Sequence, residues 1–308
     1  MSILPIHIIP HDTKIDFVAK RWWAFSVTLL LLLISFASVA THGLNLGIDF
    51  KGGILIEAKL TQNGAPQAVD TAGLREELNQ LGLGEVELQQ FGSPDDVLIR
   101  IQRQEGDETA QTKAVQSVRE KLGTSYEYRR VEVVGPTVGK ELLHAGILAT
   151  VFAMLAIAVY VAVRFEWQFG LAAFLATFHD VLVTVGFFSV LHLDFNLTAV
   201  AALLTLAGYS INDTVVVFDR IRETLRRQKA TDLRVVINDS VNQTLSRTMM
   251  TAGTTLLALL PLVFMGGATL INFAAALTWG IFVGTFSSIY VAAALLIYMP
   301  PLHRVEKK

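Results

Sequence analysis

Apolar residues gather in six long stretches along this chain, and polar residues separate them. Each stretch approaches the roughly 20 residues that an α-helix needs to cross the hydrocarbon core of a bilayer. The predicted spans are about 22–41, 142–163, 170–191, 197–218, 246–266 and 271–298. The pattern predicts a membrane protein with an all-α bundle of six transmembrane helices. Polar tails at 1–21 and 299–308 flank the bundle, and its last five helices occupy 141–298.

The segment 42–140 between the first two spans is hydrophilic, and its periodicity changes along its length. Alternating positions predict strands, and apolar residues three or four apart predict helices. The predicted order is strand 54–60, helix 67–81, strand 85–91, turn 92–95, strand 97–104, helix 108–122 and strand 126–134. This is the βαββαβ order of a ferredoxin-like α+β domain. Two helices would cover one sheet face and leave the other to a partner or to solvent.

The placement of Lys and Arg predicts the orientation in the membrane. These residues precede the first span, separate the second from the third, fill the loop 219–245 and end the chain. The opposite loops, 192–196 and 267–270, carry neither residue type. Because cytoplasmic loops are enriched in Lys and Arg, both tails and the loop 219–245 are predicted to be cytoplasmic. The domain 42–140 is then outside, or periplasmic.

Two segments leave alternatives open. Ser38 and Ala40 resemble a signal-peptide cleavage site, but the apolar run before them is long, so an uncleaved first span is favoured. The basic segment 219–245 is partly amphipathic and could lie on the membrane surface. A solvated loop that sets the topology is the favoured interpretation.

Composition supports this class and excludes several chemistries. Hydrophobic residues make up 52% and charged residues 17% of 308 residues, with a mean hydropathy of +0.49. The absence of cysteine excludes disulfides and thiolate metal sites. The sequence 135–140 resembles a P-loop but is one residue short and lacks Ser or Thr after Lys140. We therefore expect no enzyme activity, metal, cofactor or nucleic-acid partner.

Asp213, next to Asn212, and Arg247 are charged positions inside predicted spans. Asp213 lies roughly 7–8 Å from the cytoplasmic end of the fourth span at 1.5 Å per residue. An ionised side chain in the apolar core costs several kcal/mol unless it is paired or hydrated. Arg247 opens the fifth span on the same side, so the two could meet. Three interpretations of Asp213 and Arg247 are open. They could form a static salt bridge, or they could separately contact a neighbouring helix and lipid phosphates. The favoured interpretation is that Asp213 binds and releases a proton under the control of Arg247.

Other features of the spans have two interpretations each. His179 and Asp180 lie near the middle of the third span, where they could relay protons or form an interhelical hydrogen bond. Adjacent helical residues point about 100° apart, so both cannot face one direction. Gly280 and Gly284 form a GxxxG pattern in the sixth span, which favours close helix packing over a transport path.

Several motifs together resemble one known family. They are GIDFKGG at 47–53, VGPTVGKEL at 134–142, FHDVLVTVG at 178–186, GYSINDTVVVFDRIRE at 208–223, NQTLSRTMMT at 242–251 and GTFSSIYVA at 284–292. In this order they are similar to the SecF branch of the SecD/SecF family of protein-export membrane proteins. That family belongs to the resistance-nodulation-division superfamily. The match spans nearly the whole chain, except the first twenty residues and the interior of the external domain.

The resemblance implies a function that the pattern alone does not give. SecF-type chains pair with SecD in the bacterial inner membrane and associate with the SecYEG translocon and YajC. They use the proton gradient, without ATP hydrolysis, to promote export of unfolded polypeptides. The family ties the Asp of the NDT motif and the Arg of the LSRT motif to proton transfer, which implies Asp213 and Arg247 here.

The external domain begins in the GIDFKGG motif, and its glycines have a physical interpretation as well. Gly47, Gly52 and Gly53, with Asp49, lie where the chain leaves the bilayer and enters a strand. Glycines permit unusual backbone angles there. The motif is predicted either as a hinge for the external domain or as a rigid turn that starts it.

Two other functions compete with proton-driven export. A passive scaffold that stabilises SecD would need the intramembrane charges only for structure. Half of a proton-coupled small-molecule exporter would belong to the same superfamily, but such pumps carry much larger external domains than 42–140.

Overall fold

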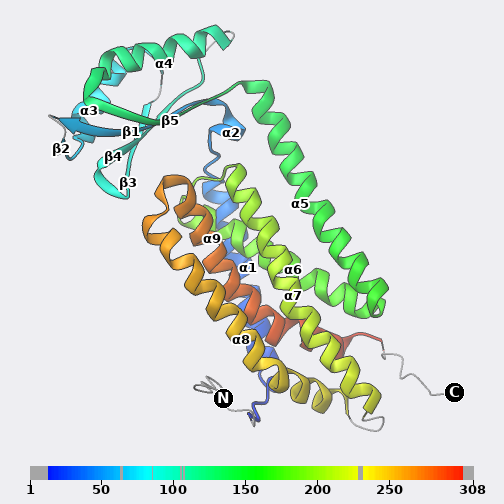
Figure 1. Ribbon diagram of the computed structural model, residues 1–308. Coiled ribbons are helices and arrows are strands. Elements are labelled where there is room, and N and C mark those ends of the chain that lie inside the picture. Colours follow the sequence, from blue (N-terminus) through cyan, green and yellow to red (C-terminus); the bar gives the residue numbers. More distant parts are fainter. Residues whose placement is uncertain are drawn as a thin grey trace.

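The computed structural model describes residues 13–62, 65–84, 86–104, 106, 108–227 and 232–300. A small α+β domain stands at one end of a bundle of long helices (Figure 1). The described residues that precede α1 and those that follow the last helix lie at the opposite end of the bundle.

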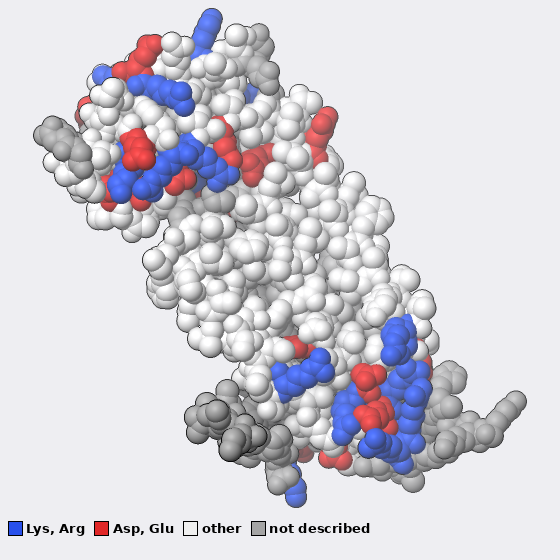
Figure 2. Space-filling view, in the orientation of Figure 1, with Lys and Arg blue, Asp and Glu red and all other residues white. Residues whose placement is uncertain are grey.

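Long helices make up the bundle: α1 (Arg21–His42), α5 (Pro136–Arg164), α6 (Trp167–Val190), α7 (Leu197–Arg227), α8 (Leu233–Met265) and α9 (Gly267–Ser287). The last continues through a π-helical turn η2 (Ser288–Ala292), α10 (Ala293–Leu295) and a 3-10 turn η3 (Leu296–Tyr298). Among the described residues, six helices are long and apolar enough to cross a membrane, which confirms the six predicted spans. Figure 2 shows charged side chains gathered at the two ends, with a largely uncharged belt between them.

The segment 219–245 differs from the predicted loop. Its described residues are helical, since α7 continues to Arg227 and α8 already begins at Leu233. Asp232 caps α8, because its carboxylate accepts a hydrogen bond from the Arg234 backbone N–H at 3.2 Å. The two extensions pack against each other through apolar residues that the loop interpretation left solvated. These side chains are Ile221, Val236, Ile237 and Val241.

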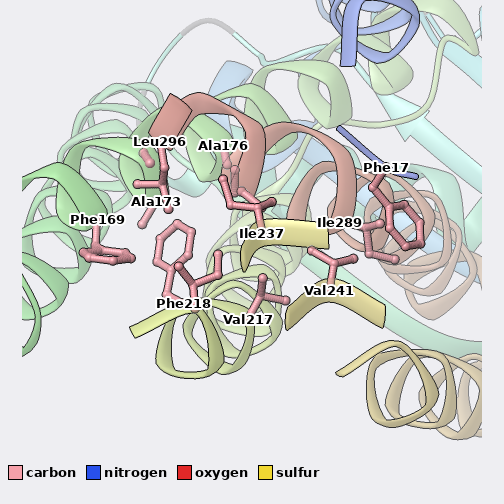
Figure 3. Close-up of a cluster of buried hydrophobic side chains, with 14 of the residues drawn as sticks. Phe17, Phe169, Ala173, Ala176, Val217, Phe218, Ile237, Val241, Ile289 and Leu296 are labelled. Atoms are coloured by element: carbon pink, nitrogen blue, oxygen red, sulfur yellow. The ribbon is translucent and has the colours of Figure 1, made fainter. Parts of the chain in front are cut away.

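A buried cluster fills the bundle at this end (Figure 3). It joins Phe17 from the segment before α1, Phe169 of α6, Phe218 of α7, Ile237 of α8 and Leu296 near the end of the last helix. The Phe169 and Phe218 rings meet edge to face at 5.1 Å. Residues from both ends of the described chain therefore share one core with α6, α7 and α8.

The α+β domain stands outside the helix bundle and is called the external domain for that reason; it has the predicted ferredoxin-like fold. Its strands are β1 (Gly53–Gln62), β2 (Ala65–Pro66), β3 (Val86–Phe91), β4 (Ser93–Ile101) and β5 (Tyr126–Val134). The main sheet is antiparallel in the order β5-β1-β4-β3, and β2 extends the pairing at the end of β1. Helices α3 (Thr71–Asn79) and α4 (Glu108–Leu122) pack on one face, and a 3-10 turn η1 (Gly123–Ser125) leads into β5.

The predicted turn at 92–95 is shorter in the structure. Ser93 already pairs with Phe91, so the reversal falls on Gly92, whose φ is 66°. That left-handed conformation favours glycine, which explains why a single residue suffices for the turn. The other sheet face is charged and turned toward the bundle, with ion pairs from Lys59 to Asp95 at 2.9 Å and from Arg129 to Asp96 at 3.0 Å.

Candidate functional site

Asp213 lies inside the bundle on α7. The residue is buried, with only 3% of its surface exposed. The Thr251 hydroxyl of α8 donates a long hydrogen bond of 3.3 Å to Oδ1 of Asp213. The second carboxylate oxygen, Oδ2, is buried and has no hydrogen-bond partner among the described residues. A carboxylate so sparsely bound is unusual, because buried charges are normally paired or fully hydrogen-bonded.

Arg247 does not form an ion pair with Asp213, which was one of the three interpretations of these charges. Its side chain is exposed on α8, and no ion pair joins it to a carboxylate of the described residues. The reason is helix rotation: α7 turns Asp213 inward, and α8 turns Thr248 and Thr251 inward, which leaves Arg247 on the outer face. Asn212 is also exposed. A guanidinium and an amide therefore face outward from the parts of α7 and α8 that are apolar enough to cross a membrane.

Asp180 is the centre of a second polar cluster, in which both of its carboxylate oxygens have partners. It is 0% exposed, and its Oδ2 accepts hydrogen bonds from Ser210 of α7 at 2.5 Å and from Ser287 of α9 at 2.9 Å. Its Oδ1 lies 2.9 Å from Nδ1 of His179. Although neighbouring residues point in different directions, both side chains are buried and touch. The other ring nitrogen of His179, Nε2, has no described partner.

A π-helical turn adjoins this cluster. It begins at Ser288, whose hydroxyl lies 2.8 Å from that of Thr214 and within 3.4 Å of the Ser210 carbonyl oxygen. Such turns often occur at functional positions. Two successive serines at this turn face different helices, because Ser287 donates to Asp180 of α6 and Ser288 contacts Ser210 and Thr214 of α7. The polar groups of α6, α7 and the last helix therefore form one connected set beside Asp213.

The GIDFKGG segment connects the external domain to the bundle. Residues 48–51 form a short helix, α2 (Ile48–Lys51), which Gly52 and Gly53 end with φ values of 77° and 133°. A side chain at Gly53 would meet the carbonyl oxygen of Ile101 at 2.8 Å, so glycine is required there.

Asp49 makes the contact that matters most for the bundle. Its Oδ2 accepts a 2.8 Å hydrogen bond from the backbone N–H of Leu197, the first residue of α7. The backbone N–H of Gly47 donates to the Phe195 carbonyl at 2.9 Å, just before that helix. The motif therefore contributes one cap to the helix that carries Asp213, and Asn196 contributes another by accepting a 3.0 Å hydrogen bond from the Ala199 N–H.

The sequence alone did not single out four contributors, three hydroxyls and one carboxylate. The Thr251 hydroxyl bonds Asp213, and the hydroxyls of Ser210 and Ser287 bond Asp180. Thr and Ser are common in membrane helices, so residue type gave no signal without knowledge of which helices touch. Asp194 was also missed: it pairs with Arg100 of β4 and accepts a 2.9 Å hydrogen bond from Asn45. Its signal was available, since it is a lone carboxylate in a loop without Lys or Arg.

No metal centre accompanies these residues in the described part of the chain, where no three His, Asp and Glu side chains could hold an ion. The geometry offers an isolated buried carboxylate, a polar set beside it and an outward-facing arginine. The question is which class of protein uses such an arrangement.

Comparison with known proteins answers it. A family described as "Protein export membrane protein SecD/SecF, C-terminal" matches residues 114–301, and the "SecD/SecF GG Motif" matches residues 37–63. The chain belongs to the SecD/SecF family. The second match includes Gly47, Asp49, Gly52 and Gly53, the residues predicted to start the external domain. This multi-pass membrane chain thus carries both signatures of the SecD/SecF family.

Within the SecD/SecF family, the SecF subunits are similar over almost the full chain. Protein translocase subunit SecF of Rickettsia felis is 43% identical over 96% of this chain and 95% of its own length. The SecF subunit of Rickettsia bellii is 42% identical over 96% of this chain and 97% of its own length. These relatives are named as transport subunits rather than enzymes.

Solved structures of SecDF share the fold. The crystal structure of SecDF, a translocon-associated membrane protein from Thermus thermophilus, is 36% identical with a TM-score of 0.82 over 94% of this chain. SecDF in its super-membrane-facing form gives a TM-score of 0.67 over 93% at the same identity. This SecD/SecF-family chain spans 39% of each of those longer chains.

Proposed function

We propose that this chain is the SecF half of a SecDF complex in the bacterial inner membrane. In this proposal, proton movement through the complex drives export of unfolded polypeptides from the SecYEG translocon, with YajC as an associated partner. The external domain is periplasmic, and the described ends of the chain are cytoplasmic, as the Lys and Arg distribution favours. No cofactor is required, because the proton gradient supplies the energy.

The observation that carries the proposal is the environment of Asp213. One oxygen is held only by a long hydrogen bond, and the other has no described partner. A carboxylate with a structural role would be expected to have its oxygens saturated, as those of Asp180 are. The free oxygen of Asp213 can accept a proton without breaking an existing bond.

The outward-facing polar side chains support a SecD partner. Arg247 and Asn212 are exposed in membrane-spanning helices, where contact with lipid tails is costly. A second helical half that covers this face removes the cost. Its movement would also change the distance from Arg247 to Asp213, and with it the stability of the ionised carboxylate.

Asp180 has a different part in this proposal. With donors from three sources, it fixes α6, α7 and the last helix around Asp213. Asp180→Asn should therefore lower the thermal stability of the purified chain, whereas Asp213→Asn should leave it nearly unchanged. If Asp180→Asn is stable but abolishes gradient-dependent export, then His179 and Asp180 belong to the proton path instead.

The decisive experiment is export of a slow precursor into vesicles that contain SecYEG, SecD and this chain. Asp213→Asn should remove the stimulation by a proton gradient, because Asn keeps size and hydrogen bonding but does not ionise. Asp219→Asn is the matched control, since it makes the same change on an exposed part of the same helix. Stimulation that persists in Asp213→Asn, with the SecD complex intact, would leave a passive scaffold as the function.

A further inference from the structure

A row of buried hydroxyls follows one face of α8. It consists of Ser240, Thr244, Thr248 and Thr251, and a rotation of about 100° per residue keeps all of them within about 80° of one another. Ser240 is 0%, Thr244 8% and Thr248 1% exposed. Ser240 donates a 3.2 Å hydrogen bond to the hydroxyl of Thr224 on α7. Because Thr251 also donates to α7, through Asp213, the hydroxyl row faces α7 at both ends.

The hydroxyl row joins Asp213 to the end of the bundle opposite the external domain. From the level of Asp213 to Ser240 it extends about 16 Å, at about 1.5 Å per residue. The Thr224 hydroxyl beside Ser240 donates to the Arg220 carbonyl at 2.9 Å. The Arg220 side chain in turn donates to the exposed Gln243 of α8 at 2.5 Å. The row therefore begins at a buried carboxylate and ends at a polar surface between α7 and α8.

The inner end of the hydroxyl row has unused hydrogen-bonding capacity. Oγ1 of Thr248 is buried and has no hydrogen-bond partner among the described residues, and the same holds for Oδ2 of Asp213. Thr248 lies one turn of α8 from Thr251, which bonds Asp213. Apolar side chains lie beside the row, and Figure 3 shows Val217 of α7 and Val241 of α8 among them. Because buried polar atoms without partners are costly, these two atoms indicate a place where water can bind.

The spacing of the hydroxyl row suits proton transfer through such water. Side chains one helical turn apart are separated by about 5–6 Å, which one water molecule spans with two hydrogen bonds of about 2.8 Å. A hydroxyl accepts a hydrogen bond on its oxygen while it donates its own hydrogen, so it can pass a proton on without a lasting change of charge. The alternative is a structural row, in which each hydroxyl only bonds its own helix, as Thr244 does with the Ser240 carbonyl at 3.0 Å.

We propose that the hydroxyl row is the path by which the proton of Asp213 leaves toward the cytoplasm. The carboxylic acid of Asp213 gives its proton to a water molecule beside Thr248. Each hydroxyl then takes up a proton on its oxygen and releases its own to the next water, and the last proton enters the solvent beside Thr224. Asp213 is left as the carboxylate, and no other group changes its charge. This path rests on the proposed function and on the proposed orientation in the membrane.

Two substitutions of Thr248 distinguish a path from a structural row. Thr248→Val keeps the shape of the side chain and removes the hydroxyl, whereas Thr248→Ser keeps the hydroxyl and removes a methyl group. In export of a slow precursor into vesicles with SecYEG, SecD and this chain, Thr248→Val should lose most of the stimulation by a proton gradient. Thr248→Ser should keep most of it. A structural row predicts the opposite order, because serine leaves a cavity in a packed interior and valine does not.

Thr254→Val is the matched control. It makes the same change on an exposed position of α8, where the hydroxyl also bonds a carbonyl four residues earlier, and it should keep the full stimulation. Ser240→Ala should lose stimulation as Thr248→Val does, because the path needs its outer end. Full stimulation in Ser240→Ala, or an equal loss in Thr254→Val, would overturn the path.

Asp213→Asn, assayed beside these variants, separates the path from the proposed function. If Asp213→Asn loses the stimulation and Thr248→Val keeps it, the path is wrong and the proposed function stands. If Asp213→Asn keeps the stimulation, both are wrong. SecD should co-purify with every variant, since none of the hydroxyl substitutions changes a charge. A loss of stimulation in Thr248→Val that accompanies loss of the SecD complex would assign Thr248 to packing and refute the path.

Discussion

Replacement of Gly186 by alanine should destabilise the bundle by forcing α1 away from α6. Gly186 is buried where these helices touch, opposite Ser35. A Cβ at Gly186 would lie 2.0 Å from Oγ of Ser35, 2.2 Å from its Cβ and 2.7 Å from its Cα. The hydroxyl can rotate away, but the Cα atom belongs to the backbone, and carbon atoms prefer separations of about 3.5–4.0 Å. The helices must therefore separate by roughly 1 Å.

The magnitude follows from this overlap. Overpacking of a tight interior costs about 1–3 kcal/mol. The same separation stretches the buried hydrogen bond between Ser38 and Ser189, now 2.8 Å, which lies one turn along both helices. Such a bond between membrane helices is worth about 0.6 kcal/mol. At about 2–4 °C for each kcal/mol, the overlap should lower the melting temperature by about 3–14 °C relative to a Gly→Ala variant that meets no such contact.

Gly253→Ala is the matched control, because a Cβ at Gly253 in α8 meets nothing within 4 Å. Both substitutions gain the helix propensity of alanine over glycine, about 1 kcal/mol, so their difference isolates the overlap. Thermal unfolding of both purified full-length variants in detergent measures it. Combining Gly186→Ala with Ser35→Gly should restore part of the loss. If Gly186→Ala melts as high as Gly253→Ala, the close contact between α1 and α6 is wrong.

Three further predictions concern the external domain and its connection to the bundle. The Ser93 hydroxyl, more than any other group, lowers the pKa of Asp95 to about 2. The stabilisation by ionised Asp95 is complete above the ordinary carboxyl pKa of about 3.9 and is lost as pH falls toward 2. The unfolding free energy of Asp95→Asn should therefore vary less between pH 2 and pH 5 than that of the wild type. Asp194→Asn should cost about 1–3 kcal/mol, because the largely buried Arg100 then keeps only its longer contact with Glu87 at 3.5 Å, and faster hydrogen exchange in β4 would show it. Asp49→Ala should cost about 0.5–1.5 kcal/mol, because the Leu197 N–H loses its carboxylate acceptor while Asn196 still caps α7, and thermal unfolding would detect the loss.

The sequence predicts the number of spans because a lipid-exposed helix must be apolar along its whole length. It did not predict where α7 ends or where α8 begins. Ile221, Val236 and Ile237 were visible as apolar positions in the segment 219–245, but burial depends on a partner surface. Once α7 and α8 lie side by side, these residues cover one another, and the helices continue past the membrane. A single chain read without tertiary contacts offers no way to distinguish that from a surface helix or loop.

The sequence predicts which residues belong to the candidate site but not the directions in which their side chains point. The cost of an ionised side chain in an apolar helix singles out Asp213 and Arg247 whatever the packing. Whether they meet depends on the rotation of α7 and α8, which the packing of both helices with their other neighbours sets. The hydroxyls around Asp180 could not be predicted either. Ser210 and Ser287 can be assigned to Asp180 only once it is known that α6, α7 and the last helix are in contact.

The position of Asp49 gives the GIDFKGG motif a consequence beyond starting a domain. Its carboxylate holds the first residue of α7, and Asp213 lies 16 residues later on the same unbroken helix, about 24 Å away. A helix packed along its length transmits a tilt from one end to the other, so a change of charge at Asp213 that shifts α7 must also shift its cap. Because the cap is joined through Gly52 and Gly53 to β1, the shift reaches the sheet of the external domain. If the backbone at these glycines is free to rotate, it takes up the movement and the domain stays in place; if it is not, the domain moves with α7. Because Gly53 is confined against the Ile101 carbonyl, we expect the domain to move with α7.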